Sequence, residues 1–167
     1  MKGSGGVDGE DFSAWYIAQR DGMARSLLMI GGDAEAVQDA VAEAFSRAYE
    51  RWSRVGSMRS PAGWVYRVAL NELRRRMRRR AFESRLLRRD RQSVVTPVEV
   101  DPELWAAVAA LSPRQREAVV LRYVADLTER DVADALGISE GAASAALVAA
   151  RRHLADRLTD RKEARTR

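Results

Sequence analysis

The stretch from residue 127 to residue 158 limits the possible folds more than any other part of the chain, because it carries the signals for two helices joined by a sharp turn. Thr128 can cap a first helix, Gly137 suits a left-handed turn position, and Ser139 can cap a second helix. Ile138 can then pack inward and hold the second helix at a large angle to the first. This pattern predicts a helix-turn-helix, with an ordinary helical hairpin as the alternative. The second helix would bury one apolar stripe, made of Ala143, Leu147, Ala150 and Leu154.

Apolar residues recur at helical spacing along the rest of the chain, and no segment alternates apolar and polar residues as a half-buried strand does. Asp33 and the Ser60-Pro61 pair are typical helix starts. The chain is therefore predicted to be all-α. One helix or a helix pair is expected from Phe12 to Ile30, and further helices are expected over residues 33–52, 60–80, 102–110 and 112–123.

The helical pattern fades in the middle of the chain, where an arginine-rich stretch is followed by Pro97 and Pro102 without any sustained period. A length of 167 residues is compatible with two small helical domains on either side of that break. The predicted organisation is a disordered N-terminal tail (1–11), a first helical domain (12–82), a flexible linker (83–101), a second helical domain (102–160) and a C-terminal tail (161–167).

The composition excludes several classes of protein. The chain has no Cys and a single His, His153, so disulfides, thiolate metal sites, Cys nucleophiles and Ser-His-Asp relays are excluded or lack their parts. We expect no metal site, no cofactor, no small-molecule substrate and no enzymatic activity. No apolar run approaches the roughly 20 residues of a membrane span, and the N-terminus does not have the pattern of a signal peptide. A cytoplasmic protein without membrane insertion is expected.

Positive charge is concentrated in the middle of the chain. The net charge is +5, and residues 61–100 hold 11 basic and 4 acidic side chains, whereas residues 101–167 hold 11 of each. Almost all the cations are Arg, whose planar fork suits phosphates and guanine edges. A nucleic acid is the expected partner. Six arginines of one predicted helix have too few acids near them in the sequence to be neutralised: Arg74, Arg75, Arg76, Arg78, Arg79 and Arg80.

Three stretches together resemble the extracytoplasmic-function type of bacterial sigma factor, within the sigma-70 family. They are DAEAVQDAVAEAFSRAYERW at 33–52, SPAGWVYRVALNELRRRMRRR at 60–80 and LSPRQREAVVLRYVADLTERDVADALGIS at 111–139. The resemblance is closest to the actinobacterial members often called SigE-like. It implies a sigma region 2 type helical bundle, a linker, and a sigma region 4 type helix-turn-helix, in that order.

The resemblance implies that the helix around Asn71 recognises and opens the −10 region of a promoter. An amide at this position can hydrogen-bond an extruded base while neighbouring guanidiniums hold the DNA backbone. Trp64 and Tyr66 can stack on bases, although aromatic residues beside apolar neighbours more often belong to a core. The residues expected at the −10 region are Asn71, Arg67, Arg74, Arg75, Arg78 and Arg79.

The same resemblance makes the outer face of the helix at 33–52 a docking surface for core RNA polymerase. The alternative is a face that is merely solvated, since charge on the outside of a helix needs no partner. The residues expected to bind polymerase are Gln38, Asp39, Glu43 and Arg47.

The second helix of the helix-turn-helix departs from the family pattern. Family members usually carry a basic residue or two at the positions matching 144–148, which read the −35 element, whereas this chain has Ser-Ala-Ala-Leu-Val there. Such side chains make no bidentate contact with guanine, so weak DNA contact and docking of another helix both remain open. The residues expected to contact DNA are Ser139, Glu140, Ala142, Ser144, Ala145, Arg151 and Arg152.

Together these features predict a transcription initiation factor that binds core RNA polymerase, opens the −10 region and contacts the −35 region, without hydrolysing a nucleotide. Its expected partners are core RNA polymerase, promoter DNA and an anti-sigma factor, and its expected place is the cytoplasm, at the nucleoid. Two alternatives remain. One is a sigma-like interaction protein with degenerate −35 reading, and the other is a conventional helix-turn-helix regulator of duplex DNA.

Overall fold

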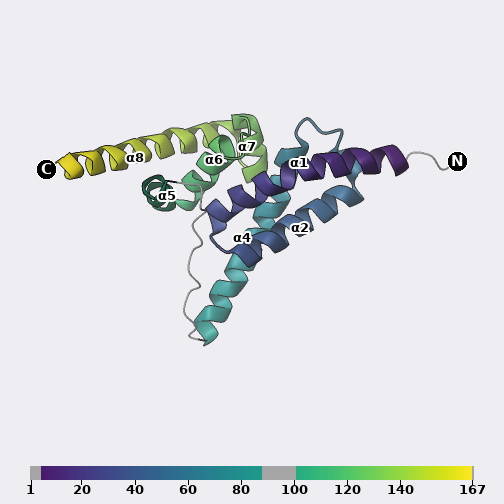
Figure 1. The fold of residues 1–167 in the computed structure, drawn as a ribbon, viewed down its shortest axis with the longest axis horizontal. Helices are drawn as coiled ribbons and strands as arrows, with labels where there is room; N and C mark the ends of the chain where they lie inside the picture. The colour runs from purple at the N-terminus through teal and green to yellow at the C-terminus, as the bar shows by residue number, and fades with distance from the viewer. Residues whose placement is uncertain (1–4, 88–100, 167) are drawn as a thin grey trace.

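The computed structural model describes residues 5–87 and 101–166, and these residues fold into eight α-helices without a strand (Figure 1). Helices α1 to α4 form a first lobe and α5 to α8 form a second lobe. The predicted all-α fold of two helical domains is therefore confirmed. The helices are α1 (Gly5–Gly31), α2 (Ala34–Glu50), α3 (Trp52–Val55), α4 (Pro61–Leu87), α5 (Pro102–Ala109), α6 (Pro113–Tyr123), α7 (Glu129–Leu136) and α8 (Glu140–Thr166).

The first lobe is organised around α2, which packs against both α1 and α4. As predicted, Asp33 caps α2, because its Oδ1 accepts a hydrogen bond from the Ala36 amide at 3.0 Å. Val37, Val41 and Phe45 recur at helical spacing on α2 and are all buried in the lobe. The opposite face of α2 carries mostly polar side chains.

An aromatic cluster fixes the N-terminal half of α1 against α2 and the short helix α3. The rings of Trp15 and Trp52 lie 4.9 Å apart, and the Phe12 ring meets the Trp52 ring edge-on at 5.1 Å. Ring pairs at these distances attract one another in addition to burying apolar area. The Trp52 indole N–H also donates a hydrogen bond to the Asp11 carboxylate at 3.2 Å.

The helix caps of the second lobe follow the predicted signals. The Ser112 hydroxyl accepts a hydrogen bond from the Gln115 amide at 3.4 Å, and α6 begins there. Gly137 adopts φ 66° and ψ 38°, a left-handed conformation that a Cβ atom disfavours, so α7 ends sharply at this residue. Helices α7 and α8 are bent by 106° with respect to each other, within the range of a helix-turn-helix.

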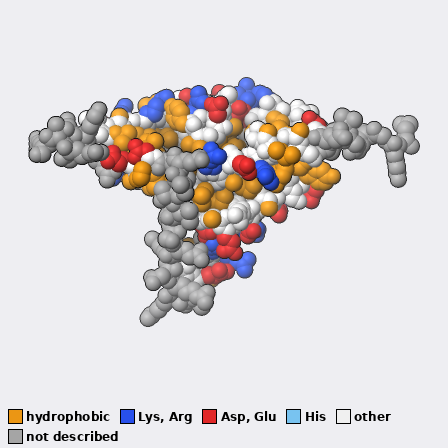
Figure 2. Space-filling view, viewed as in Figure 1, with side chains coloured by type: hydrophobic (Ala, Val, Ile, Leu, Met, Phe, Trp, Pro, Cys, Tyr) orange, Lys and Arg blue, Asp and Glu red, His pale blue; other side chains and the backbone are white. Residues whose placement is uncertain are grey.

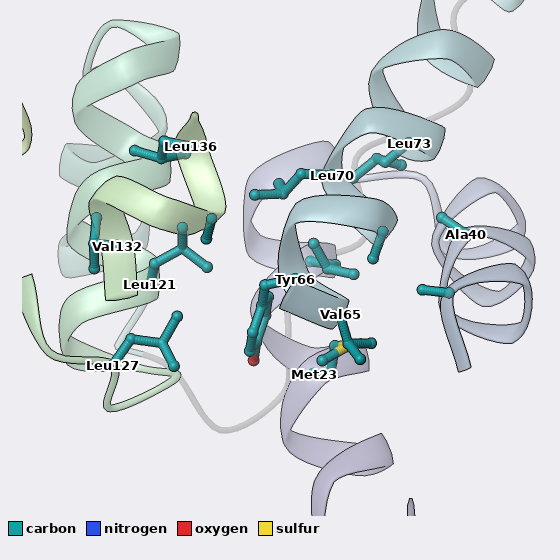
Figure 3. Packing of buried hydrophobic residues seen from close by; sticks show 14 of the residues in the cluster. Met23, Ala40, Val65, Tyr66, Leu70, Leu73, Leu121, Leu127, Val132 and Leu136 are labelled. Carbon is teal, nitrogen blue, oxygen red and sulfur yellow. The ribbon is translucent and has the colours of Figure 1, made fainter. Parts of the chain in front are cut away.

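The two lobes share one hydrophobic core (Figure 3). Leu121, Leu127 and Leu136 of the second lobe face Tyr66 and Leu70 of α4, and all five side chains are buried. Helix α4 therefore lies between α2 on one side and α7 on the other. A smaller cluster also crosses between the lobes, made of Met29, Trp105, Val108 and Val120.

Several helix boundaries differ from the predictions. Helix α1 begins at Gly5, inside the expected disordered tail, and α8 runs to Thr166, through most of the expected C-terminal tail. Helix α4 continues to Leu87, inside the expected linker, whose residues 88–100 lie outside the described residues. A helix that is already nucleated and packed is extended at little cost, and Ala, Arg, Leu and Glu favour that extension in α4 and α8. Within the described ranges no single helix is long and apolar enough to cross a membrane.

Candidate nucleic-acid interface

The residues of α4 that were expected to contact the −10 region lie mostly on one exposed face of that helix. Ser60 sets the register at its start, because its hydroxyl accepts a hydrogen bond from the Gly63 amide at 3.0 Å. Ala69 and Leu73 then point into the core. Side chains three and four residues apart share a helix face, which brings together Arg67, Asn71, Arg74 and Arg78.

Most arginines of α4 form ion pairs, so the expectation that they lack acidic neighbours is wrong. The count along the sequence missed the carboxylates of α6 and of α2 with its cap, and it underrated Glu72 and Glu83, which lie one turn from their partners in α4 itself. Figure 2 shows basic and acidic side chains interleaved over the visible face, without one continuous basic surface. The pairs are Arg74 with Glu117, Arg75 with Glu72, Arg76 with Glu72 and Asp39, Arg79 with Glu83, and Arg80 with Asp33 and Glu35.

Four of the five expected −10 arginines remain open to solvent. Arg67 and Arg78 are exposed and form no ion pair with a described residue. Arg75 and Arg79 are 70% and 81% exposed, and ion pairs this exposed are weak enough to exchange for another anion. Arg74 differs, because only 29% of its side chain is exposed.

Asn71 lines an open depression between α2 and α4. The depression has a volume of about 420 Å³ and is lined by Arg47, Val68, Asn71, Glu72 and Arg75. The Asn71 Oδ1 accepts a long hydrogen bond of 3.5 Å from Arg74, and its amide NH₂ group donates to no described residue. Arg47, which was expected on the polymerase surface, therefore shares this hollow with Asn71 and Arg75, which were expected on the DNA surface.

Glu72 anchors one side of this depression. Its side chain is 6% exposed and accepts hydrogen bonds from Arg75 at 2.8 and 3.1 Å and from Arg76 at 2.9 Å. The hydrogen bond from Arg75 lowers the pKa of Glu72 below its ordinary value despite the opposing effect of burial, and the same bond raises the pKa of Arg75. Glu72 is therefore ionised at neutral pH and orients two guanidiniums.

The aromatic residues of α4 belong to the core to different degrees. Tyr66 is 3% exposed, and its hydroxyl donates a hydrogen bond to the Ser26 hydroxyl at 3.2 Å. Burial raises the pKa of Tyr66. Trp64 is half-buried against the same core, as the core interpretation predicts. In this arrangement the Tyr66 ring is closed to a nucleobase.

The four residues of α2 that were expected to bind polymerase lie on its outer face. Gln38 and Asp39 are exposed, and Asp39 accepts a hydrogen bond from Arg76 at 2.7 Å. Glu43 and Arg47 bind each other at 2.7 Å across one turn of the helix while 41% and 47% of their side chains stay exposed. The face is therefore polar, mixed in charge and open to a partner.

At the start of α8, two of the expected DNA-contacting residues have structural partners. The Ser139 hydroxyl caps the helix by accepting a hydrogen bond from the Ala142 amide at 3.1 Å. Glu140 lies 3.3 Å from Arg130 of α7, with about two thirds of each side chain exposed. Ser139 and Glu140 are therefore poorly suited to recognise a base in a DNA groove.

Farther along α8, the exposed face is apolar and ends in cations. Ala145 and Val148 are exposed and are followed on the same face by Arg152, which forms no ion pair with a described residue. Arg151 donates a hydrogen bond to the Tyr123 hydroxyl at 3.2 Å. Ala142 is also exposed, whereas Ser144 is half-buried. The arrangement offers phosphate contacts at Arg151 and Arg152.

Charged residues that bridge the lobes were missed by the sequence reasoning. Arg59 binds Asp131 through Nη1 at 2.7 Å and Asp134 through Nη2 at 2.6 Å. Arg74 binds Glu117 through Nε at 3.0 Å and through Nη2 at 2.7 Å. These contacts join the loop before α4, and α4 itself, to α6 and α7.

The sequence contains a signal for the bridging role of Glu117, but the local pattern around Asp131 suggests only a helix cap. Glu117 is an acid among the buried apolar residues of α6, and an acid in that position calls for a cation from another element. Asp131 follows Thr128 at capping-box spacing, and the Thr128 hydroxyl does donate to it at 2.7 Å. Burial opposes the ionisation of Asp131, but Thr128 and Arg59 outweigh burial and lower its pKa.

The described residues offer no constellation for metal chemistry. No group of three or more His, Cys, Asp or Glu side chains in the described ranges could hold a metal ion. A ring nitrogen of His153, Nδ1, lies 3.1 Å from the Gln115 amide oxygen, which is an ordinary surface hydrogen bond.

Known sequence families match both lobes. The family model of Sigma-70 region 2 matches residues 16–83, and that of Sigma-70, region 4 matches residues 102–154. The RNA polymerase sigma-E factor of Streptomyces coelicolor is 28% identical over 155 residues, which cover 90% of this chain and 88% of that protein. The RNA polymerase sigma-E factor of Streptomyces antibioticus is 29% identical over 155 residues, covering 90% of this chain and 86% of that protein.

Two solved structures share the fold. The sigma factor RpoE in complex with the anti-sigma factor NepR, from Bartonella quintana, aligns with a TM-score of 0.75 at 20% identity and covers 90% of this chain and 98% of that chain. CnrH in complex with the cytosolic domain of CnrY aligns with a TM-score of 0.60 at 21% identity and covers 89% of this chain and 88% of that chain. At these identities the agreement supports the fold alone.

Proposed function

Because this chain belongs to the sigma-70 family, as a transcription initiation factor of the extracytoplasmic-function type, we propose that α4 captures the opened strand of the −10 promoter region with Asn71 and the arginines around it. As a sigma factor the chain binds core RNA polymerase and directs it to promoters, and it is not an enzyme. The function expected from the sequence is confirmed at that level. Which residues perform this function is what we propose here.

The observation that carries this proposal is that Asn71 lines the depression between α2 and α4. Val68 lines it with an apolar side chain, and Arg47, Glu72 and Arg75 line it with charged groups. An unstacked base needs an apolar surface and hydrogen-bonding groups for its edge, and an amide can both donate and accept. An extruded base would therefore occupy this hollow, with the Asn71 amide on its edge.

The surrounding arginines would hold the DNA backbone. Arg67 and Arg78 are exposed without an ion pair to a described residue, and Arg75 and Arg79 are exposed enough to trade their carboxylate partners for phosphates. Strand opening would be driven by the better binding of the opened strand, with no nucleotide hydrolysed by this chain.

The second lobe would contact DNA upstream, at the −35 region, with little base reading. Arg151 and Arg152 can bind phosphates, and Ala145 and Val148 can contact thymine methyl groups. The outer face of α2, with Gln38, would dock on core polymerase. The sigma factor RpoE of Bartonella quintana, solved in complex with the anti-sigma factor NepR, supports an anti-sigma partner for this chain as well. A protein that acts with core RNA polymerase acts in the cytoplasm, and we propose that this chain associates there with the nucleoid.

Reconstitution with core RNA polymerase from a related high-GC bacterium tests the proposal. Complex formation and transcription start sites would be measured on fragmented genomic DNA, with Asn71→Ala as the diagnostic variant. We expect core binding to be unchanged and promoter-directed transcription to fall about tenfold, because one base loses its polar contacts. Ser53→Ala, an exposed change on α3 that does not line the depression, is the control.

The outcomes separate the candidate functions. Wild-type transcription by Asn71→Ala would show that Asn71 does not capture a base. Core binding without discrete start sites would favour a sigma-like interaction protein with degenerate −35 reading. Tight binding to a palindromic duplex without polymerase would favour a conventional helix-turn-helix regulator.

A further inference from the structure

Gln38 and Arg47 lie at opposite edges of the outer face of α2, although both were expected to bind polymerase. Nine positions separate the two residues, and at about 100° a residue this places their side chains half a turn apart on the helix. Arg47 lies on the edge that faces α4, because it lines the depression together with Asn71 and Arg75. A flat partner surface laid directly on Gln38 would therefore not cover Arg47.

The guanidiniums of Arg47 and Arg75 are both held by acids, and both keep free donors. Glu43 accepts a hydrogen bond from Arg47 Nε at 2.7 Å, and neither Nη group of Arg47 donates to a described residue. Glu72 accepts hydrogen bonds from Nε and Nη2 of Arg75 at 3.1 and 2.8 Å, and Nη1 donates to none of the described residues. An arginine that is already held in this way loses little conformational freedom when its outer donors bind an anion.

One acid acts on both arginines, which indicates that their guanidiniums lie close together. The hydrogen bond to Glu72 is the main cause of the raised pKa of Arg75, and the charge of Glu43 raises it further. Glu43 therefore lies within electrostatic reach of Arg75 while it binds Arg47. Two guanidiniums that lie near one carboxylate can also bind one phosphate, since the planar fork of Arg suits either anion.

The acids orient these cations without closing the depression to a polyanion. The side chains of Arg75 and Arg47 are 70% and 47% exposed, whereas that of Glu72 is 6% exposed. A strand that approaches the depression therefore meets the guanidiniums before it meets Glu72. Glu43 is 41% exposed, and an ion pair this exposed is weak enough for the carboxylate to turn into solvent when a phosphate binds.

We propose that Arg47 and Arg75 form a phosphate-binding site across the depression, in which Arg47 binds the backbone of the opened strand and not core polymerase. This inference rests on the function proposed for α4, because the bound phosphate adjoins the base held by Asn71. The strand then crosses from α4 to the C-terminal half of α2. Helix α2 serves both partners, since Gln38 at one edge docks on polymerase and Arg47 at the other binds DNA.

Replacing Arg47 separates the two partners. Arg47→Gln removes the charge of an exposed side chain and keeps a polar group. Binding of the full chain would be measured with a fluorescein-labelled single strand of mixed sequence, about 20 nucleotides long, and in a separate titration with core polymerase. We expect the affinity for the strand to fall about fivefold at low salt and the slope of log affinity against log salt to become shallower by about 0.7. Core polymerase binding should be unchanged.

Arg20→Gln is the matched control. Arg20 is 50% exposed, pairs with a neighbouring acid on α1 and does not line the depression, so its replacement makes the same change in net charge. Its affinity for the strand and its salt slope should follow the wild type. Equal losses in both variants would reduce the effect to net charge and overturn the proposal. Weaker core binding by Arg47→Gln with an unchanged strand slope would assign Arg47 to the polymerase surface and would also overturn it.

A double-mutant cycle tests whether the two arginines bind the same phosphate. Arg47→Gln and Arg75→Gln each remove one side of the site, so the double variant should lose less affinity for the strand than the product of the two single losses. Arg20→Gln/Arg75→Gln should lose the full product. A full product for the pair of Arg47 and Arg75 would mean that the two arginines bind separate anions, and would overturn the shared site.

Failure of this inference is distinguishable from failure of the proposed function. A wild-type chain that directs no transcription from discrete start sites, or one that is unaffected by Asn71→Ala, overturns the function proposed for α4. A chain that is active and depends on Asn71, but binds the strand equally well with Arg47→Gln, overturns the role of Arg47 alone.

Discussion

Helices α4 and α8 are each 27 residues long and each carry residues proposed to contact DNA, but the two helices are held in opposite ways. Helix α4 lies between two layers, and carboxylates from α2 and α6 bind its arginines. Helix α8 is seated by small and apolar residues, among them Ala143, Leu147 and Ala150, which are fully buried. Its cations Arg151 and Arg152 form no ion pair with a described residue.

The comparison teaches that the density of arginine along a sequence is a poor measure of the charge that a partner meets. The arginine-rich helix keeps much of its charge in internal pairs, whereas Arg151 and Arg152 of the alanine-rich helix form no ion pair with a described residue. Internal pairs also couple α4 to the position of the second lobe, through Arg74 and Glu117. No described side chain of α8 forms an ion pair with the first lobe, and the position of α8 depends largely on apolar contacts that respond little to salt.

The largest effect should come from removing the apolar seat of α8. Leu147 is fully buried, so Leu147→Ala deletes packed methyl groups and leaves a cavity. We expect a loss of about 3 kcal/mol in the free energy of unfolding, measured by urea denaturation. Val148→Ala, one residue farther and 45% exposed, should change stability by less than about 0.5 kcal/mol. Equal losses would mean that α8 is not seated through Leu147.

The second effect concerns the exposed cations of α4. The triple variant Arg75→Ala/Arg78→Ala/Arg79→Ala removes three of the proposed phosphate contacts while leaving Arg74 and the lobe contact in place. Binding to a mixed-sequence single strand should weaken by about 100-fold at low salt. The slope of log affinity against log salt should become shallower by about 2, since each single-strand phosphate contact contributes about 0.7.

The matched variant of α8 is Arg151→Ala/Arg152→Ala. It should leave the single-strand slope unchanged and flatten the slope for upstream duplex DNA, also by about 2. If the α8 variant flattened the single-strand slope as much as the α4 variant, the division of DNA contacts between the two helices would be wrong.

The sequence was sufficient for most of the fold, because local signals decided it. Asp33, Ser112, Thr128 and Gly137 cap or end helices where the residue types predict, and each acts through backbone groups a few residues away. The ends of α1 and α8 were predicted less well. Their lengths depend on how far a packed helix is extended, and no local stop signal marks that point.

The candidate site was less predictable, because it depends on contacts between distant parts of the chain. The pair of Arg74 with Glu117 joins residues 43 positions apart, and the pair of Arg59 with Asp134 joins residues 75 positions apart. The amphipathic pattern of one helix does not reveal which other helix lies against it. The pairing of Arg74 and Arg80 therefore could not be predicted, whereas Arg75 and Arg79 pair with Glu72 and Glu83 of the same helix, whose spacing is visible in the sequence.

A third and smaller effect tests the turn that places α8. Gly137 has φ 66°, so Gly137→Ala should cost about 1 kcal/mol of unfolding free energy, because a Cβ atom disfavours that conformation. Gly141 lies in the first turn of α8, and a Cβ atom there would meet nothing within 4 Å. Gly141→Ala should therefore stabilise the protein, by up to about 1 kcal/mol. Opposite signs in thermal denaturation support the left-handed turn, and a neutral Gly137→Ala would contradict it.

The smallest effect is a loss of unfolding free energy at acid pH, which is expected from the ion pairs of α4 and not from the apolar contacts of α8. The pKa of Glu72 is lowered by its hydrogen bond from Arg75, so its contribution to stability is complete above the ordinary value of 4.5 and is lost as the pH falls through the lowered value. Glu72→Gln should cost only about 0.5 kcal/mol at pH 7, because the amide oxygen still accepts hydrogen bonds and Arg76 keeps Asp39. Between about pH 5 and pH 3 the variant should lose less stability than the wild type. Asp33 and Asp131, whose pKa values are also lowered, retain part of the dependence of stability on pH.

Glu50→Gln, an exposed change on α2, should follow the wild type. A Glu72→Gln curve parallel to the wild type would mean that the ion pairs of α4 contribute nothing to its stability, and the contrast with the apolar seat of α8 would then rest on geometry alone.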